Sequence, residues 1–321
     1  MEMPGTRVSN DFASAFLTGR GLPDVKPASV LVHNRRDSVM FFAMRDGAPL
    51  YLVRLARHPK DNGLVVAEYD TLVKLKQRLA GCERLEGSIP APVRLDYHVG
   101  RAFLVTDWFS GRKDLLFRFD RQRCADAVDW LVALHQETGA VSTFGRDLLT
   151  QYVGRYSNSP PDAPLPGELR SLFDDTVDSF GALNTEAVPV AFTHNDFSAA
   201  NILFGDRGRV SVVDWATATE KGFLFLDAFD IALYLVNNAL NDYPRSLRRL
   251  AGGGGAKEGE LRRMCGTYIR GFNLSQGMLH WLLKVFFLSK ACRFHWAGRP
   301  ERVRQLIECF RVSRDIDVRF G

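Results

Sequence analysis

The sequence has no apolar run long enough to cross a bilayer. Its longest candidate, MLHWLLKVFFL from Met278, is shorter than the roughly 18 residues that a span needs and contains Lys284. Residues 1–21 lack a basic start followed by an apolar stretch, so we expect no secretory signal. The five cysteines are scattered and form no CxxC pair, which argues against a disulfide framework or a zinc site. These absences predict a cytoplasmic protein without a transmembrane segment.

The composition is ordinary, but the charge is unevenly distributed. The 321 residues are 46% hydrophobic and 25% charged, as in globular proteins long enough to form two lobes. Residues 241–321 contain 16 Lys and Arg against 7 Asp and Glu, a local balance of +9 within a net charge of +5. This region lacks the clustered aromatics on an exposed sheet that nucleic-acid binding uses, so we expect no nucleic-acid partner.

The first third of the chain has the pattern of a sheet with one inserted helix. Its Asp-Gly pair within residues 45–48 is a strong hairpin signal. Apolar residues at helical spacing predict a helix over 64–79. The alternating apolar segments predict strands at 29–33, 38–45, 49–56, 92–98 and 101–108.

The rest of the chain is mostly helical in pattern. An amphipathic helix over 122–139 is followed by two short strands, at 188–192 and 209–215, and by further helices. Loops are predicted at the Pro-rich 157–167 and the Gly-rich 251–259. We therefore predict an α+β fold with a small β-rich N-terminal lobe (1–106), a hinge (107–111) and a larger, mostly helical C-terminal lobe (112–321).

A polar cluster lies in FTHNDFSAANILFGDRGRVSVVDWA, residues 192–216. Phosphoryl transfer needs a carboxylate that orients or deprotonates the acceptor hydroxyl, and hard oxygen ligands for Mg²⁺. Asp196 is the candidate catalytic base. Asn201, five residues later, and Asp214, after the apolar VSVV, are the candidate metal ligands. The five-residue spacing is that between base and metal ligand in a kinase catalytic loop.

The motif HND at His194, with Asn201 and the later VDW at Val213, resembles the aminoglycoside phosphotransferase and choline kinase superfamily. The specific part of the resemblance covers residues 190–235. It implies a bilobal protein-kinase-like fold, with ATP and Mg²⁺ as cofactors. It also implies that His194 and Asp230 are structural supports of the catalytic loop.

The resemblance also implies a nucleotide site in the first lobe. Members carry a Lys on the third strand, ion-paired with a Glu on the following helix. Here LYLVRLAR places Arg54 at the Lys position, and Glu68 matches the partner. Arg keeps the charge but is bulkier than Lys, so this departure bears on the catalytic rate more than on nucleotide binding.

Two further segments are expected to contact the nucleotide. The sequence has no GxGxxG, but the turn HNRRDS is expected to cover the phosphates with its backbone amides and Ser38. LVTDWFSG resembles a kinase hinge, in which the backbone of Asp107 and Phe109 would hydrogen-bond the adenine.

These features predict an ATP-dependent phosphotransferase whose acceptor is a hydroxyl of a small metabolite. A neutral or anionic sugar-like acceptor is favoured and an amino alcohol comes second. A polycationic aminoglycoside is less favoured, because it fits poorly with the basic C-terminal quarter. Aromatic-cage candidates for an amino alcohol are Tyr234, Tyr268, Trp281 and Trp296. The apolar segment 277–296 is read first as a buried helix and second as a peripheral membrane contact.

Two alternative functions stay open. An aminoglycoside-modifying phosphotransferase is the enzymatic alternative. A nucleotide-binding pseudokinase scaffold is the non-enzymatic one, because Arg54 replaces the Lys and the glycine loop is missing. Nothing like the activation segment of a protein kinase follows Asp214.

Overall fold

The computed structural model describes residues 26–34, 37–154, 165–252, 254–313 and 320. The chain divides into two compact units. The described residues up to Ala80, with Ile89–Ser110 and Asp214–Ala216, form the N-terminal unit; the others form the C-terminal unit. Turn residues 35 and 36 and most of the predicted loop 157–167 lie outside the described ranges.

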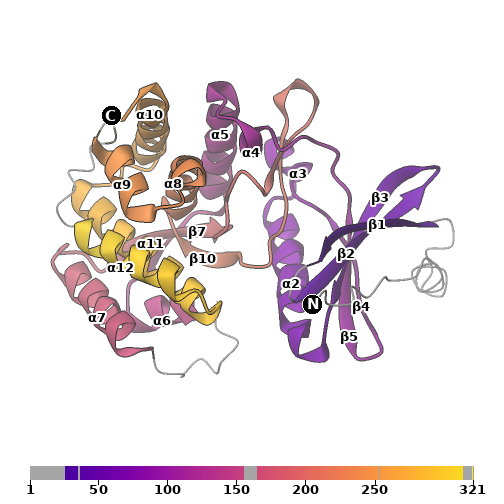
Figure 1. The fold of residues 1–321 in the computed structure, drawn as a ribbon, viewed down its shortest axis with the longest axis horizontal. Coiled ribbons are helices and arrows are strands. Elements are labelled where there is room, and N and C mark those ends of the chain that lie inside the picture. The colour runs from indigo at the N-terminus through magenta and orange to yellow at the C-terminus, as the bar shows by residue number, and fades with distance from the viewer. Residues whose placement is uncertain (1–25, 35–36, 155–164, 253, 314–319, 321) are drawn as a thin grey trace. The chain divides into compact units, whose positions relative to one another are not determined.

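The N-terminal unit is an antiparallel five-stranded sheet with strand order β1-β2-β3-β5-β4, and helix α2 packs against it (Figure 1). All five predicted strands and the helix are confirmed, with bounds within a few residues of those expected. The elements are β1 Lys26–Asn34, β2 Ser38–Arg45, β3 Ala48–Ala56, the 3₁₀ helix η1 Pro59–Asp61, α2 Asn62–Arg78, β4 Pro92–His98 and β5 Arg101–Asp107.

Local sequence explains this unit. Asp46 and Gly47 both have positive φ, 51° and 79°, which is the conformation of a two-residue type I′ hairpin between β2 and β3. Helix α2 buries Val65, Leu72 and Leu75, which recur at helical spacing, against β3, β4 and β5. The predicted hairpin and amphipathic helix therefore arise from short-range signals.

The C-terminal unit contains helices and two small sheets, of order β10-β7-β6 and β8-β9. Its helices are α3 Glu83–Glu86, α4 Asp114–Phe117, α5 Arg121–Thr138, α6 Arg146–Gly154, α7 Gly167–Gly181, α8 Leu226–Leu240, α9 Tyr243–Gly252, α10 Ala256–Gly271, α11 Gln276–Trp296 and α12 Pro300–Val312. Its strands are β6 Ala140–Thr143, β7 Ala187–Thr193, β8 Ile202–Phe204, β9 Val210–Val212 and β10 Thr219–Phe223, with the 3₁₀ helix η2 Asp206–Gly208.

Helix α11 forms much of the core of this unit. Ser275 caps its N-terminus by accepting a hydrogen bond from the Met278 N–H (3.2 Å), and most of its side chains are buried. The first interpretation of this segment, a buried helix, is confirmed. No helix among the described residues has the length and apolar character of a membrane span.

The predicted loop over 251–259 is wrong at both ends. Helix α9 continues to Gly252 and α10 begins at Ala256, despite the run of glycines. The side chains that follow the glycines make tertiary contacts: Arg249 pairs with Glu258, and Lys257 Nζ donates to the Leu235 carbonyl (2.6 Å). These contacts extend α10 into a segment whose local preference is for a loop.

Candidate active site

The loop that carries Asp196 connects β7 to β8, and one buried carboxylate accepts hydrogen bonds from its backbone. Asp227, in the first turn of α8, accepts hydrogen bonds from the backbone N–H groups of His194 (2.6 Å) and Asn195 (2.7 Å). Each of its two oxygens takes one donor. We expected this support from Asp230, but the residue that holds the loop lies three positions earlier. Asp230 is instead paired with Lys290 of α11 at 2.6 Å.

Asn195 fixes the conformation of the residue before the candidate base. Its φ of 62° is in the left-handed region, which side chains other than glycine adopt infrequently. Its buried amide oxygen accepts from Tyr152 (2.7 Å) and Thr193 (3.1 Å), and its Nδ2 donates to the Thr217 carbonyl (2.9 Å). These bonds stabilise a strained backbone at a site position. The sequence analysis assigned Asn195 no role.

His194 is buried and connects the loop to the end of β9. Its Nε2 lies 3.0 Å from the Val213 carbonyl, and its own carbonyl accepts from the Thr217 hydroxyl (3.2 Å). The Val213 N–H donates to the Asn201 carbonyl (3.0 Å). The residue directly before Asp214 is therefore tied to the catalytic loop at both its N–H and its carbonyl.

Asp196 is an ionised, accessible carboxylate with two polar partners. Its Oδ1 accepts from Arg293 Nη1 (2.9 Å), and its Oδ2 accepts from Asn201 Nδ2 (3.2 Å). Burial raises its pKa, but Arg293 and then Lys290 outweigh that effect and hold the pKa well below the usual range. Asn201 Nδ2 also donates to the Asp196 carbonyl (2.9 Å), so the amide oxygen of Asn201 is the atom left for a cation.

A second buried layer supports Asp227. The Tyr268 hydroxyl accepts from the Phe225 N–H (3.1 Å) and lies 2.5 Å from Nδ1 of His135, whose Nε2 is 3.8 Å from Asp227 Oδ2. The Tyr268 hydroxyl can donate its proton to His135 Nδ1 when the ring carries its own proton on Nε2, the nitrogen that faces Asp227. Burial lowers the pKa of His135 to about 3, which keeps the ring neutral. His135 and Tyr268 are supporting residues that the sequence analysis did not identify.

In the N-terminal unit, Arg54 is buried among three carboxylates. Its Nη1 donates to Glu68 (2.6 Å) and to Asp214 (3.2 Å), and its Nη2 lies 3.7 Å from Asp37. Burial alone would lower the pKa of the guanidinium, but the three carboxylates raise it well above the usual range. Burial raises the pKa of Glu68, and Arg54 opposes that rise. Glu68 also accepts from the Trp215 N–H (3.2 Å).

The charges of this cluster suit a divalent cation. One guanidinium among three carboxylates leaves a formal charge of −2, and Asp214 has a left-handed backbone with φ 68°. Carboxylate and amide oxygens are the ligands that Mg²⁺ prefers, and Mg²⁺ in proteins usually takes one or two carboxylates plus substrate phosphates. No group of three or more His, Cys, Asp and Glu side chains in the described part of the chain could hold a metal by itself. The donors present fit a metal that arrives with a nucleotide.

The sequence matches the phosphotransferase enzyme family over residues 32–254. This chain belongs to that family. No match was found among curated proteins.

Solved structures of kinase-like phosphotransferases share the fold. The choline kinase LicA from Streptococcus pneumoniae aligns with a TM-score of 0.57 at 10% identity, over 94% of this chain and 98% of that one. The amicoumacin kinase hAmiN, in complex with AMP-PNP, Ca²⁺ and Ami, aligns at 0.56 and 12%, over 91% and 88%. The macrolide 2'-phosphotransferase MphH from Brachybacterium faecium aligns at 0.53 and 13%, over 94% and 97%. At these identities the likeness establishes the α+β, kinase-like fold of this phosphotransferase.

The other predicted nucleotide contacts of this phosphotransferase are placed as follows. Ser38 is buried; its hydroxyl accepts from Arg54 Nε (3.3 Å) and donates to Asp37 (3.2 Å), so its side chain positions Arg54 instead of covering phosphates as expected. The Asp107 N–H donates to the Ala91 carbonyl (3.1 Å), and burial raises the pKa of the Asp107 carboxyl. The Phe109 N–H has no hydrogen bond within the described residues, which leaves it available to a ligand.

Two of the four aromatic-cage candidates cannot contact an acceptor, because Tyr268 and Trp281 are buried in the core. Tyr234 and Trp296 are half-buried. Burial and then Asp196 raise the pKa of Tyr234, so this ring lies within electrostatic range of the candidate base. The cage expected for an amino alcohol is therefore not formed by the set that the sequence suggested.

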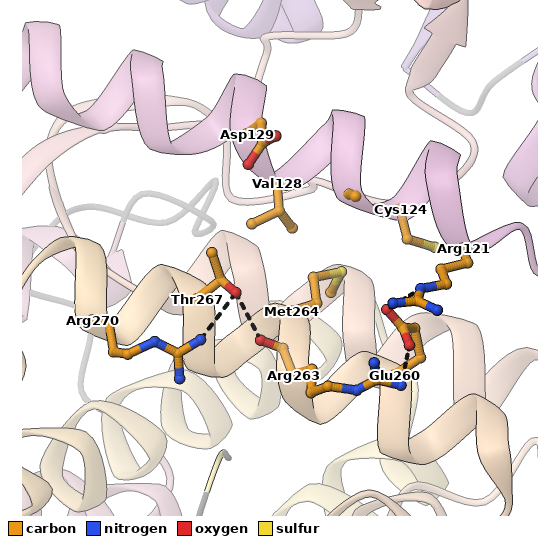
Figure 2. Close-up of a pocket in the computed structure, with 10 residues that line it drawn as sticks. Arg121, Cys124, Val128, Asp129, Glu260, Arg263, Met264, Thr267 and Arg270 are labelled. Carbon is orange, nitrogen blue, oxygen red and sulfur yellow. Dashed lines mark hydrogen bonds and ion pairs between the residues drawn. The ribbon is translucent and has the colours of Figure 1, made fainter.

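A pocket of about 240 Å³ lies between α5 and α10 of this phosphotransferase (Figure 2). Its charged lining side chains interact with one another: Glu260 accepts from Arg121 at 2.9 Å and also pairs with Arg263. Burial raises the pKa of the lining Cys124 thiol to about 12, which leaves it unreactive at neutral pH. None of the predicted site residues lines this pocket.

Proposed function

We propose that the protein is an ATP-dependent phosphotransferase that moves the γ-phosphate to a hydroxyl of a small metabolite. The observation that supports this most strongly is Asp196: an ionised, accessible carboxylate on a loop whose backbone is held by Asp227 and strained at Asn195. Such preorganisation is what a positioned general base requires. The family to which the chain belongs provides the reaction class.

Each polar residue then has one task. Asp196 orients the acceptor hydroxyl and takes its proton. Asn201 and Asp214 provide oxygen ligands for the cation, and Arg54, positioned by Glu68, binds phosphate oxygens. When bound, ATP supplies the phosphoryl group and Mg²⁺ neutralises the charge of its phosphates. The Phe109 N–H and the Asp107 carbonyl hold the adenine, within a hinge proposed for residues 107–111.

The test is Asp196→Asn, which keeps the shape of the side chain and removes its charge. We expect turnover, measured as ADP release with a panel of hydroxylated acceptors, to fall by about 10²-fold or more. Affinity for ATP and Mg²⁺ should stay close to that of the wild type. Asp206→Asn, an exposed carboxylate in η2, is the matched control and should leave both quantities unchanged.

Full activity in Asp196→Asn would exclude Asp196 as the base. A wild-type protein that binds ATP with Mg²⁺ and turns over no acceptor in the panel would favour a nucleotide-binding scaffold. That alternative has one structural basis: Arg54, in place of the usual Lys, is engaged by three carboxylates and Ser38.

A further inference from the structure

Two cations of α11 lie beside the candidate base. Lys290 and Arg293 are three residues apart and therefore neighbours on the helix surface. Lys290 is neutralised by the buried Asp230 at 2.6 Å. Arg293 donates to Asp196 and to the Asn195 carbonyl (3.5 Å), and its side chain is 29% exposed, close to the 28% of Asp196. Both members of this pair are therefore accessible to a ligand.

Arg302 of α12 adds a third cation. Its guanidinium lies over the Tyr243 ring, 5.3 Å from the centroid, and donates to Asn241; it has no carboxylate partner within the described residues. Burial and Asp230 raise the pKa of the Tyr243 phenol, and Lys290, Arg302 and Arg293 oppose that rise. The Tyr243 ring also packs against Phe294 of α11, the residue after Arg293, with ring centroids 6.3 Å apart. We call Lys290, Arg293 and Arg302 the cationic cluster.

The charge balance of this region disfavours a cationic acceptor. Beside the base, Arg293 and Lys290 balance Asp196 and Asp230, and Arg302 on α12 adds a cation that has no carboxylate partner within the described residues. The wider region is also basic, with 16 Lys and Arg against 7 Asp and Glu over residues 241–321. Potentials of one sign attract ligands of the other.

The proposal rests on the proposed phosphotransfer to a hydroxyl and names the class of acceptor. We propose that the acceptor carries an anionic group, a carboxylate or a phosphate, close to its reacting hydroxyl, and that Arg293 binds this group. Arg293 Nη1 is 2.9 Å from the Asp196 oxygen, so a small acceptor whose hydroxyl reaches Asp196 lies within contact distance of the guanidinium. A guanidinium binds carboxylate and phosphate through two parallel N–H bonds, and Arg302 adds attraction at longer range.

The test compares acceptors that differ in one charged group. Glycerol with glycerate, and glucose with gluconate and glucose 6-phosphate, form matched sets, and choline is the cationic probe. We expect wild-type kcat/KM, from ADP release, to be about 10-fold or more higher for the anionic member of a set. Gluconate against glucose 6-phosphate separates a carboxylate from a phosphate.

Arg293→Gln should raise the KM for the anionic acceptor by about 10-fold or more and remove the preference for it, with the KM for ATP unchanged. The deciding quantity is kcat/KM for the anionic acceptor divided by kcat/KM for its neutral match. Any effect on kcat of losing the contact between Arg293 and Asp196 applies to both acceptors and cancels in this ratio. Arg293→Lys should retain part of the preference. Arg311→Gln, which removes an exposed Arg–Glu168 pair on α12, is the matched control.

Some outcomes overturn the proposal while the phosphotransferase function stands. These are a preference for the neutral member or for choline, or an Arg293→Gln variant in which only the KM for ATP rises. Thermal unfolding with the same ligands, without ATP, separates the two ideas. If anionic ligands raise the Tm of the wild type but not of Arg293→Gln, the anion site stands even without turnover. If no anionic acceptor raises the Tm of the wild type and none is turned over, the proposal is overturned.

Discussion

Removing the buried charge of Arg54 is the most informative perturbation of the N-terminal unit. Arg54→Met leaves a side chain of similar length but deprives Glu68, Asp214 and Asp37 of their shared cation. Breaking a buried ion pair by removing one partner costs about 3–5 kcal/mol, because the other charge stays buried without compensation. Glu68 dominates this cost, since it is the most buried of the three carboxylates.

The second variant removes the remaining charge as well. In Arg54→Met/Glu68→Gln, the amide oxygen at position 68 can still accept the Trp215 N–H, which Glu68 Oε1 accepts at 3.2 Å. We therefore expect the double variant to recover more than half of the stability lost in Arg54→Met, with a coupling energy of about 2–3 kcal/mol. Arg54→Lys keeps a charge without the fork, so it should lie between the two in stability and raise the KM for ATP moderately.

The assay is urea denaturation followed by tryptophan fluorescence, with hydrogen exchange of the β3 amides to localise the effect. Arg94→Met is the control, because the Arg94–Asp96 pair lies in the same sheet with side chains 40% and 30% exposed. Its loss should cost less than about 1 kcal/mol. An Arg54→Met variant that loses no more than this control, or a double variant no more stable than the single one, would refute the electrostatic account of this cluster.

Three further predictions concern the support of the catalytic loop. Burial raises the pKa of Asp227 from 3.8 to about 7, so between these values the folded protein holds a proton that the unfolded chain has released, and stability falls as the pH rises. Asp227→Asn should remove a slope of roughly 1.4 kcal/mol per pH unit, measured by denaturation from pH 4.5 to 7.5; an unchanged slope would show that Asp227 does not titrate there. Tyr268→Phe should cost about 2 kcal/mol or more, because the Phe225 N–H and His135 lose their buried partner; a loss below 0.5 kcal/mol in urea denaturation would contradict this. Gly222→Ala should lower both Tm and turnover, because a Cβ at this position would overlap the side chain of Thr193 in β7. An unchanged Tm would show that β10 can shift to make room for the methyl group.

Short-range patterns of the sequence predicted most of the N-terminal sheet. Alternating apolar residues, the Asp46-Gly47 turn and the stripe on α2 depend on backbone geometry over a few residues, so they can be read without the fold. The same is true of the spacing from Asp196 to Asn201. The short strands β6, β8 and β10 were not predicted. Each is three to five residues long and is stabilised by hydrogen bonds to a neighbouring strand, so its own sequence carries little signal.

The supports of the site were decided by tertiary structure. Asp227 and Asp230 are three residues apart on one helix, and nothing local distinguishes them. The position of α8, whose N-cap residue Phe225 has φ 75°, determines that Asp227 reaches the loop amides while Asp230 reaches Lys290. The position of a helix is set by packing of the whole core, which a short stretch of sequence does not specify.

Arg293 shows the same limit more strongly. It lies 97 positions after Asp196 in an apolar segment that indicates only a buried helix. Its neighbours in the sequence do not mark it as a partner of the catalytic loop. By itself, the sequence predicted the class of chemistry, because the candidate base Asp196 and the candidate metal ligand Asn201 lie at a fixed spacing within one loop. Only the tertiary structure decided which charges surround that base, because electrostatic partners are chosen by distance in space and not by distance along the chain.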